Sequence, residues 1–270
     1  AHDEALFAYH GTSQLVVVDG ATDRRTPLGR PGLYSQAQPS PDGRYVLVTT
    51  LVAPFSRLVP FTSFAHTVAI WDRSGTIART IATAPVADNV PNGGVPTGPR
   101  AIRWQASAPA TVTWAEALDG GNPKTEAAER DRVVTLAAPF PAAPAELTRT
   151  AFRFGGLLWT SAGVTLVTES DRTTRRTRTW VIDRPGAEPR KLWDRSAEDA
   201  YSHPGSPIRR PGASGLEVIP QTGDTIFLAG AGASPQGEKP FLDALNLRTL
   251  EATRRYQMTE GYEPVLGLLA

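Results

Sequence analysis

The sequence predicts an all-β fold built from repeated small sheets, and three observations carry this prediction. Short runs of β-branched and aromatic residues, each bounded by Gly, Pro, Asp or Asn, recur along the chain, whereas a helical spacing of apolar residues is hard to find. Glycine and proline contribute 24 residues each to the total of 270, so turns are frequent. Two kinds of hairpin also alternate along the chain.

The first kind of hairpin joins two strands through a polar turn, and it occurs five times. The copies span residues 14–29, 68–82, 133–150, 179–193 and 241–256. In four copies an Asp or Asn begins the turn, where its short side chain can bond to the backbone. These markers are Asp19, Asp72, Asp183 and Asn246. The copy at 133–150 keeps only the two strands.

The second kind of hairpin is typified by residues 39–48, in which Asp42-Gly43 closes a tight turn before an apolar strand. Weaker copies occur at 104–116, 159–169 and 219–230. One hairpin of each kind gives a unit of four strands.

The spacing of the markers gives the length of this unit. Asp19 and Asp72 lie 53 positions apart, and Asp183 and Asn246 lie 63 apart. Four strands at a period in or slightly above the range of about 40–50 residues are typical of propeller blades. We therefore predict a partial β-propeller of about five four-stranded blade equivalents. A β-sandwich is the alternative, but it would not repeat two hairpin types in register.

Three segments between the hairpins, residues 51–65, 83–99 and 118–130, are too long for tight turns. Long loops on a rigid scaffold often carry function, although they can also be plain connections. Both interpretations stay open for each loop.

Composition excludes several kinds of partner and site. The net charge of +1 argues against a nucleic-acid or membrane partner held by bulk charge. The chain has no cysteine, so it can form neither a disulfide nor a thiolate zinc site. No apolar run approaches the length of about 18 residues that a membrane span needs. We expect a soluble chain, cytoplasmic or secreted/periplasmic, with the compartment left open.

Catalytic motifs are scarce. The string Gly-x-Ser-x-Gly of a hydrolase nucleophile elbow is absent, and its nearest counterparts, residues 212–215 and 232–235, are better interpreted as turns. The four histidines have no metal-ligand spacing, and no phosphate-binding glycine loop is present. We predict no metal and no cofactor. The histidines are His2, His10, His66 and His203.

Neighbouring carboxylates leave a propeller glycosidase as a rival function. The pairs are Glu116 with Asp119 and Glu198 with Asp199. Residues 119–122 also offer oxygen ligands for calcium, although a plain Asp-Gly turn is the favoured interpretation.

One cluster of charge departs from the balanced background. Arg172, Arg175, Arg176 and Arg178 fall within seven residues. Arginine binds carboxylates through a fixed fork of donors. If the run enters a strand, Arg176 and Arg178 share one face and Arg175 points to the other. The cluster is either a solvated or interblade ion-pair face or a binding site for an acidic substrate.

Ten local motifs follow one another along the chain, at residues 3–7, 40–45, 54–56, 71–72, 98–100, 114–121, 174–180, 194–199, 232–235 and 240–243. Taken in this order, they resemble the glutamyl endopeptidase branch of the prolyl oligopeptidase superfamily over essentially the whole chain.

This resemblance implies a serine peptidase in which a β-propeller precedes an α/β-hydrolase domain that holds the Ser, Asp and His of the triad. Residues 1–270 match only the later part of the propeller, opening at Asp3–Phe7 and stopping at Tyr262–Val265, where another blade strand begins. The early blades and the catalytic domain are expected to be missing, so the chain alone should be inactive.

In the superfamily such propellers cap the active site and restrict entry to peptides or unfolded segments. The resemblance therefore implies a gating role with a peptide substrate, and cleavage after glutamate makes the arginine-rich run at 174–180 the candidate for binding the substrate carboxylate. A free-standing five-bladed propeller that binds a ligand in its central channel is the alternative function.

Overall fold

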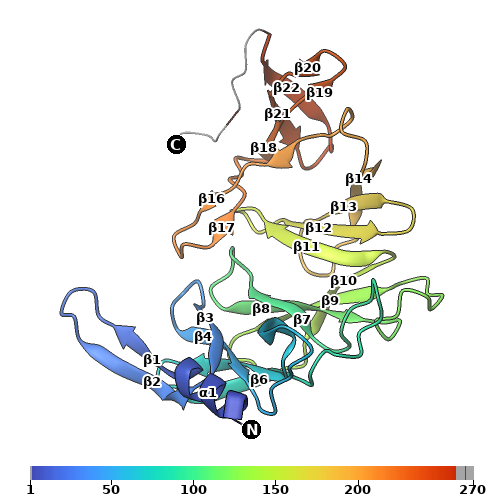
Figure 1. Cartoon of the computed structure of the whole chain (residues 1–270). Coiled ribbons are helices and arrows are strands. Elements are labelled where there is room, and N and C mark those ends of the chain that lie inside the picture. The colour runs from blue at the N-terminus through green and yellow to red at the C-terminus, as the bar shows by residue number, and fades with distance from the viewer. Residues whose placement is uncertain (1, 260–264, 266–270) are drawn as a thin grey trace. The chain divides into compact units, whose positions relative to one another are not determined.

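The computed structural model describes residues 2–259 and residue 265, and it divides into two compact units, Ala1–Arg149 and Thr150–Ala270. The predicted β-propeller class is confirmed, because four antiparallel sheets of four strands follow one another along the chain (Figure 1). The blade strand expected at 262–265 lies outside the described residues except for Val265.

The first unit contains two of the four-stranded blades. Its first blade is β3 (Tyr34–Pro39), β4 (Tyr45–Leu51), β5 (His66–Asp72) and β6 (Ile77–Ala84). Its second blade is β7 (Arg100–Trp104), β8 (Thr111–Ala117), β9 (Asp131–Ala137) and β10 (Ala145–Thr150). Ahead of them come α1 (His2–Gly11) and the two-stranded sheet of β1 (Ser13–Val18) and β2 (Arg25–Gly32), and η1 (Phe61–Ser63) lies between β4 and β5.

The second unit contains the other two blades. One is β11 (Arg153–Trp159), β12 (Thr165–Asp171), β13 (Arg176–Ile182) and β14 (Arg190–Ser196). The other is β15 (Ser206–Pro207), β18 (Thr225–Gly230), β21 (Phe241–Asn246) and β22 (Ala252–Gln257). Two small sheets accompany it: β16 (Arg210–Pro211) with β17 (Glu217–Val218), and β19 (Ala233–Ser234) with β20 (Gly237–Glu238).

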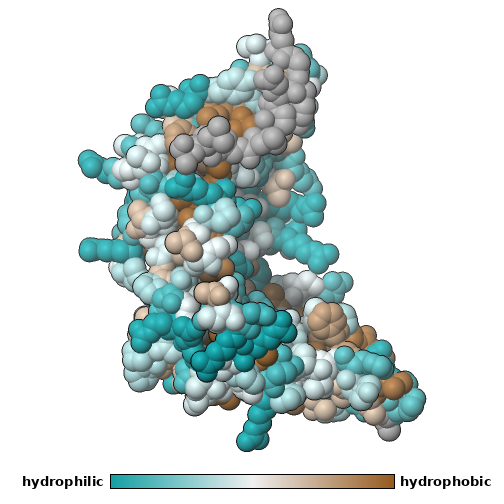
Figure 2. Space-filling view, turned by 90° about the vertical axis from the view of Figure 1, so that its left-hand side faces the viewer, coloured by the Kyte–Doolittle hydropathy of each residue, from teal (hydrophilic) through white to brown (hydrophobic). Residues whose placement is uncertain are grey.

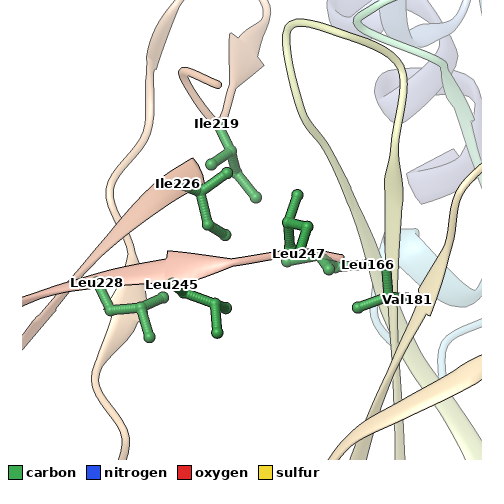
Figure 3. Close-up of a cluster of buried hydrophobic side chains, with 7 residues drawn as sticks. All are labelled: Leu166, Val181, Ile219, Ile226, Leu228, Leu245 and Leu247. Carbon is green, nitrogen blue, oxygen red and sulfur yellow. The ribbon is translucent and has the colours of Figure 1, made fainter. Parts of the chain in front are cut away.

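The blades of the second unit pack through branched apolar side chains (Figure 3). Leu166 and Val181 come from β12 and β13, and they share one cluster with residues of the next blade. In that blade Ile226, Leu228 and Leu245 are each at most 1% exposed. Alternating apolar positions on neighbouring strands therefore supply the contact that holds two small sheets together.

In the first unit the β1–β2 hairpin packs on the first blade, where Leu28 joins Val48, Ala69 and Trp71. Gly29 permits this close approach. It has a φ of +69°, and a Cβ atom there would lie 2.2 Å from the Trp71 ring. No other residue type meets both conditions without strain.

The predicted turn chemistry is confirmed for three of the four markers. Asp19 accepts hydrogen bonds from the backbone N–H groups of Ala21 and Thr22. Asp72 and Asn246 likewise accept backbone N–H groups of their own turns. Asp183 instead accepts from Arg190 Nη2 at 2.7 Å.

For the hairpin predicted at 219–230, the first of its two strands is wrong. The turn at 222–225 forms, but Ile219 before it bonds to the backbone of Trp159 and Ser161. The partner of β18 is β15, which is only two residues long. Pro207 in β15 has no N–H to donate, so neither propensity nor alternation marks this strand in the sequence.

The helix α1 is a second departure from the prediction. Its apolar residues show no helical spacing, and contacts with a distant segment of the same unit support it. Glu4 accepts a hydrogen bond from the backbone N–H of Phe55 at 2.9 Å, and Phe7 packs edge-on against Phe55 and Phe64. Within the described part of the chain, no helix has the length and apolar character needed to cross a bilayer.

Hydrophilic residues cover most of the face seen in Figure 2, and hydrophobic residues show there as separate patches.

Candidate functional site: the two faces of the β11–β14 blade

Strand pairing fixes which side chains share a face of this blade. Arg178 of β13 stands opposite Glu169 of β12 and Asp194 of β14, whereas Thr177 stands opposite Arg195. Because side chains alternate along a strand, Arg176 and Arg178 lie with Glu169 and Asp194 on one face. Thr177 and Arg195 lie on the other.

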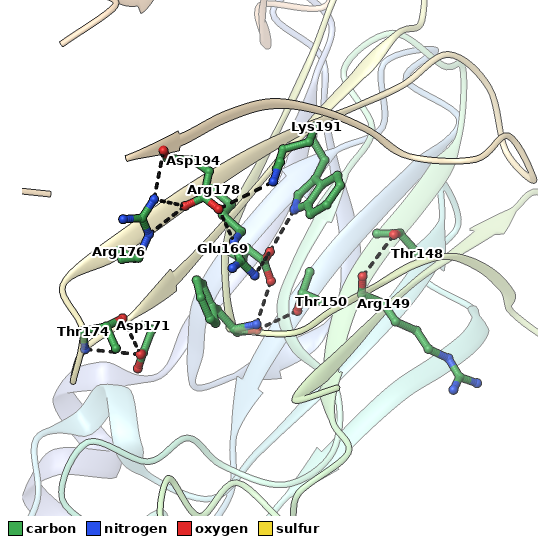
Figure 4. A network of polar contacts seen from close by, with 12 residues as sticks. Thr148, Arg149, Thr150, Glu169, Asp171, Thr174, Arg176, Arg178, Lys191 and Asp194 are labelled. Carbon is green, nitrogen blue, oxygen red and sulfur yellow. Dashed lines mark hydrogen bonds and ion pairs between the residues drawn. The ribbon is translucent and has the colours of Figure 1, made fainter. Parts of the chain in front are cut away.

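The first face carries an ion-pair network centred on Asp194 (Figure 4). Arg176 donates to this carboxylate from Nε at 2.8 Å and from Nη2 at 2.6 Å. Arg178 donates from Nε at 2.9 Å, and Lys191 Nζ lies 3.7 Å away. The hydrogen bond from Arg176, followed by that from Arg178, holds the pKa of Asp194 below its ordinary value.

Glu169 is a fully buried carboxylate within the same network. It accepts from the backbone N–H of Phe152 at 2.7 Å and from Trp180 Nε1 at 2.8 Å. The guanidinium of Arg178 lies 3.9 Å from this carboxylate and stacks 3.9 Å above the Phe152 ring. These contacts offset the cost of burying the charge.

The structure brings together two of the four predicted site residues and leaves the other two apart. Arg176 and Arg178 share Asp194, as the predicted alternation requires. Arg175 lies in the preceding turn with a φ of +56° and pairs with Glu198 at 3.1 Å. Arg172 is exposed in that turn. Their role in substrate binding stays a prediction.

The second face of the blade forms one wall of a groove of about 420 Å³. Thr168, Thr177 and Thr179 line this groove together with Trp193 and Arg195. Residues 203–207, which lead into β15, and Arg209 complete its lining.

Three basic side chains line the groove, and their partners differ. Arg209 pairs with Glu217 at 2.7 Å. His203 Nδ1 accepts from the backbone N–H of Gly205, and burial, followed by the charge of Arg195, lowers the pKa of this histidine. Arg195 donates from Nη2 to the carbonyl of Asp199 at 2.6 Å, but its buried Nε has no hydrogen-bond partner among the described residues.

Sequence reasoning missed Arg195 as a site residue because it looked for a dense run of arginines. The signal was available in the alternation of β14, where Trp193 and Arg195 share a face and Asp194 takes the other. A single sequence does not show how the strands pair, and this pairing decides which face of β14 forms ion pairs and which face lines the groove.

The rival carboxylate pairs are engaged in separate contacts. Glu116 pairs with Arg132 at 2.6 Å, and Asp119 pairs with Arg130 at 2.7 Å. Asp119 also accepts from the backbone N–H of Gly121. In the second pair, Glu198 binds Arg175 and Asp199 binds Ser202. No group of three potential metal ligands occurs in the part of the chain that the structure describes.

The three long segments predicted as loops meet in the first unit. A groove of about 500 Å³ is lined by Thr62, Ser63 and His66, by residues 84–91 and 95–97, and by Gly120. Gly121 closes this arrangement, because its carbonyl accepts from the N–H of Val95 at 3.0 Å and a Cβ atom there would lie 2.0 Å from the Val95 oxygen.

Comparison with known proteins confirms the resemblance to the glutamyl endopeptidase branch. No family model matches the chain. A probable chloroplastic glutamyl endopeptidase of Oryza sativa subsp. japonica is 37% identical over 284 residues, covering 100% of this chain and 30% of that protein. Its counterpart from Arabidopsis thaliana is 38% identical over 287 residues, covering 100% and 29%. The chain thus spans less than a third of the length of these relatives.

Similar solved structures include two peptidases with low sequence identity. Pyrococcus horikoshii acylaminoacyl peptidase is 12% identical with a TM-score of 0.47, over 90% of this chain and 34% of that chain. The β-propeller domain of the trilobed protease from Pyrococcus furiosus is 11% identical, also with a TM-score of 0.47, over 90% and 62%.

Proposed function

We propose that this chain, related over its full length to a segment of the glutamyl endopeptidases, is the non-catalytic β-propeller portion of a serine peptidase. In this proposal it controls which peptides reach a catalytic domain that lies on other polypeptide. The observation that carries the proposal is the identity of 37–38% along the whole chain to proteins about three times longer.

The chain's own residues support a role in admission rather than in bond cleavage. Its sequence holds no Gly-x-Ser-x-Gly string, and the histidine of the candidate groove, His203, bonds to a backbone N–H. The blades are rigid sheets, and they carry long loops that line a groove of about 500 Å³. A rigid scaffold with such loops can select substrates by size and chemistry.

The test compares a complete peptidase containing this segment with its catalytic domain expressed without it. We expect the complete enzyme to cleave a short glutamyl peptide far faster than a folded protein that contains the same site. Without the propeller, this preference should fall markedly. An unchanged preference would contradict the gating role, and so would hydrolysis by the isolated chain that a serine-directed inhibitor abolishes.

Substrate binding by the arginine-rich run is a second part of the proposal. Arg172 and Arg175 lie in an exposed turn, and the side chain of Arg176 stays 43% exposed while it binds Asp194. In the complete enzyme, Arg176→Ala should raise KM for glutamyl substrates much more than for glutaminyl ones. Equal effects on both substrates would assign Arg176 to the ion-pair network alone.

A further inference from the structure

The arginines on the two faces of the β11–β14 blade differ in their bonding partners. On the face of Asp194, Arg176 and Arg178 are both bonded to a carboxylate. On the groove face, Arg195 makes no ion pair within the described residues, and the acceptor it does have is a backbone carbonyl. Arg195 therefore has no carboxylate within ion-pair distance among the described residues, unlike Arg176 and Arg178. The pKa of the nearby Asp199 is lowered by the hydrogen bonds that its carboxylate accepts and also by the charge of Arg195.

The contacts around Arg195 leave hydrogen-bonding capacity unused. Its Nε is buried and has no acceptor in the described part of the chain. The nearby Asp199 does not fill this role, because its carboxylate accepts from the hydroxyl and the N–H of Ser202. A buried donor without a partner costs free energy, and a rotation of the guanidinium toward an acceptor in the groove would recover it.

The composition of the groove favours an anionic peptide. Its lining includes Arg195 but, among the described residues, no Asp or Glu. Arg209 also lines the groove but is paired with Glu217. The lowered pKa of His203 favours its neutral form, so Arg195 supplies the charge. Threonine hydroxyls and Trp193 add groups that can bond to or pack against a peptide. A volume of about 420 Å³ lies within the range of small-ligand sites, about 300–1,000 Å³.

We propose that this groove binds the carboxylate side chain of a peptide, with Arg195 as the residue that recognises the carboxylate. The inference rests on the proposed function, since it gives the admitted peptide a specific contact on the propeller. It adds a cation that lies outside the arginine-rich run.

The first experiment needs no substitution and uses the isolated 270-residue chain. The Nε–H of an arginine gives its own signal in a ¹⁵N–¹H correlation spectrum. We expect titration with acetyl-Ala-Glu-Ala-amide to move the Arg195 Nε signal, with saturation in the millimolar range or below. The matched peptide acetyl-Ala-Gln-Ala-amide should bind at least about tenfold more weakly, because it lacks the charge.

A third peptide, acetyl-Ala-Gln-Ala with a free C-terminal carboxylate, separates the two sources of this chemical group. Weaker binding than that of the glutamyl peptide supports a side-chain site. Equal or tighter binding of this peptide would overturn the proposal in favour of a site for peptide C-termini.

Variants then assign the binding to Arg195. Arg195→Gln should weaken binding of the glutamyl peptide at least about tenfold. Arg195→Lys keeps the charge but loses the planar fork of donors, so its affinity for the glutamyl peptide should lie between those of the unmodified chain and Arg195→Gln. Arg184→Gln is the matched control, because it removes the same charge from an exposed turn of the same blade and should bind like the unmodified chain. Thermal melting checks that each variant folds.

Three results would overturn the inference: no shift of the Arg195 Nε signal at peptide concentrations up to about 10 mM, equal binding of the Glu and Gln peptides, or equal affinities of Arg195→Gln and Arg184→Gln. Such a failure would leave the gating role intact, since gating is measured in the complete enzyme by its preference for short peptides. If the propeller bound the glutamyl peptide but its removal did not change the enzyme's preference for short peptides, only the gating role would be contradicted.

Discussion

At the scale of single residues, Asp194 shows how a dense charge run becomes structure. Its carboxylate joins Arg176 and Arg178, which lie two residues apart on one face of β13 and would otherwise repel each other as like charges. The side chain of Asp194 is only 18% exposed, so water screens these interactions less than at an open surface.

Replacing Asp194 by Asn should lower the free energy of unfolding by about 1–3 kcal/mol, because the charge-assisted hydrogen bonds of two arginines are lost. Chemical denaturation measures the change. Asp183→Asn is the control, since the pair of Asp183 with Arg190 is largely exposed and should contribute at most about 1 kcal/mol. Equal losses in both variants would contradict the central position of Asp194.

The pH dependence of stability has a definite sign at the same residue. Because the native contacts lower the pKa of Asp194, the folded state binds its proton less readily than the unfolded state. The stabilisation is complete above the ordinary pKa of an aspartate, about 3.8, and is lost as the pH falls through the lower native value. We expect stability to fall below about pH 4, and to fall less steeply in Asp194→Asn. Denaturation midpoints from pH 3 to 6 test this, and parallel profiles would contradict it.

The residue scale also marks the limit of sequence reasoning. The alternation of Arg176 and Arg178 could be predicted, because it depends only on the period of a strand. The partners Glu169 and Asp194, and the open groove beside Arg195, could not, because they depend on the register between strands that are far apart in sequence.

At the scale of elements, the β1–β2 hairpin depends on Gly29. Gly29→Ala should destabilise the first unit by about 1–3 kcal/mol, because the new Cβ meets the Trp71 ring and the residue keeps a positive φ. Gly20→Ala is the matched control, since no atom lies within 4 Å of its added Cβ. Thermal unfolding followed by tryptophan fluorescence reports both. A neutral Gly29→Ala would show that the hairpin packs differently.

Packing between blades is the second property of this scale. Leu228→Ala removes a side chain that is 0% exposed and should cost about 2–5 kcal/mol. Leu58→Ala, at a position 88% exposed, should change stability by less than about 0.5 kcal/mol. Denaturant unfolding compares them, and similar costs would contradict the assignment of Leu228 to the contact between blades.

Most elements could be predicted because their signals are local. A β-branched run and a turn beginning with Asp or Asn need no information from elsewhere in the chain, and the five polar-turn hairpins are confirmed. The exceptions depend on distant contacts. Helix α1 is supported by Phe55 and Phe64, and β15 is a two-residue strand defined only by its pairing with β18.

At the scale of the whole molecule, repetition determines both what could be predicted and what the chain can do. A repeated unit of two hairpins predicts a propeller even though the copies share little identity, because a blade needs only the apolar pattern. Such a scaffold positions loops and grooves but carries no elbow for a nucleophile. The function we propose for such a scaffold is to select peptides for a catalytic domain that lies on other polypeptide.

The most direct test of this account is one incubation of the isolated chain with acetyl-Ala-Glu-Ala-amide, followed by mass spectrometry of the peptide. We predict that the peptide remains intact while the Arg195 Nε signal reports binding in the same sample. Appearance of cleavage products that a serine-directed inhibitor suppresses would contradict the account.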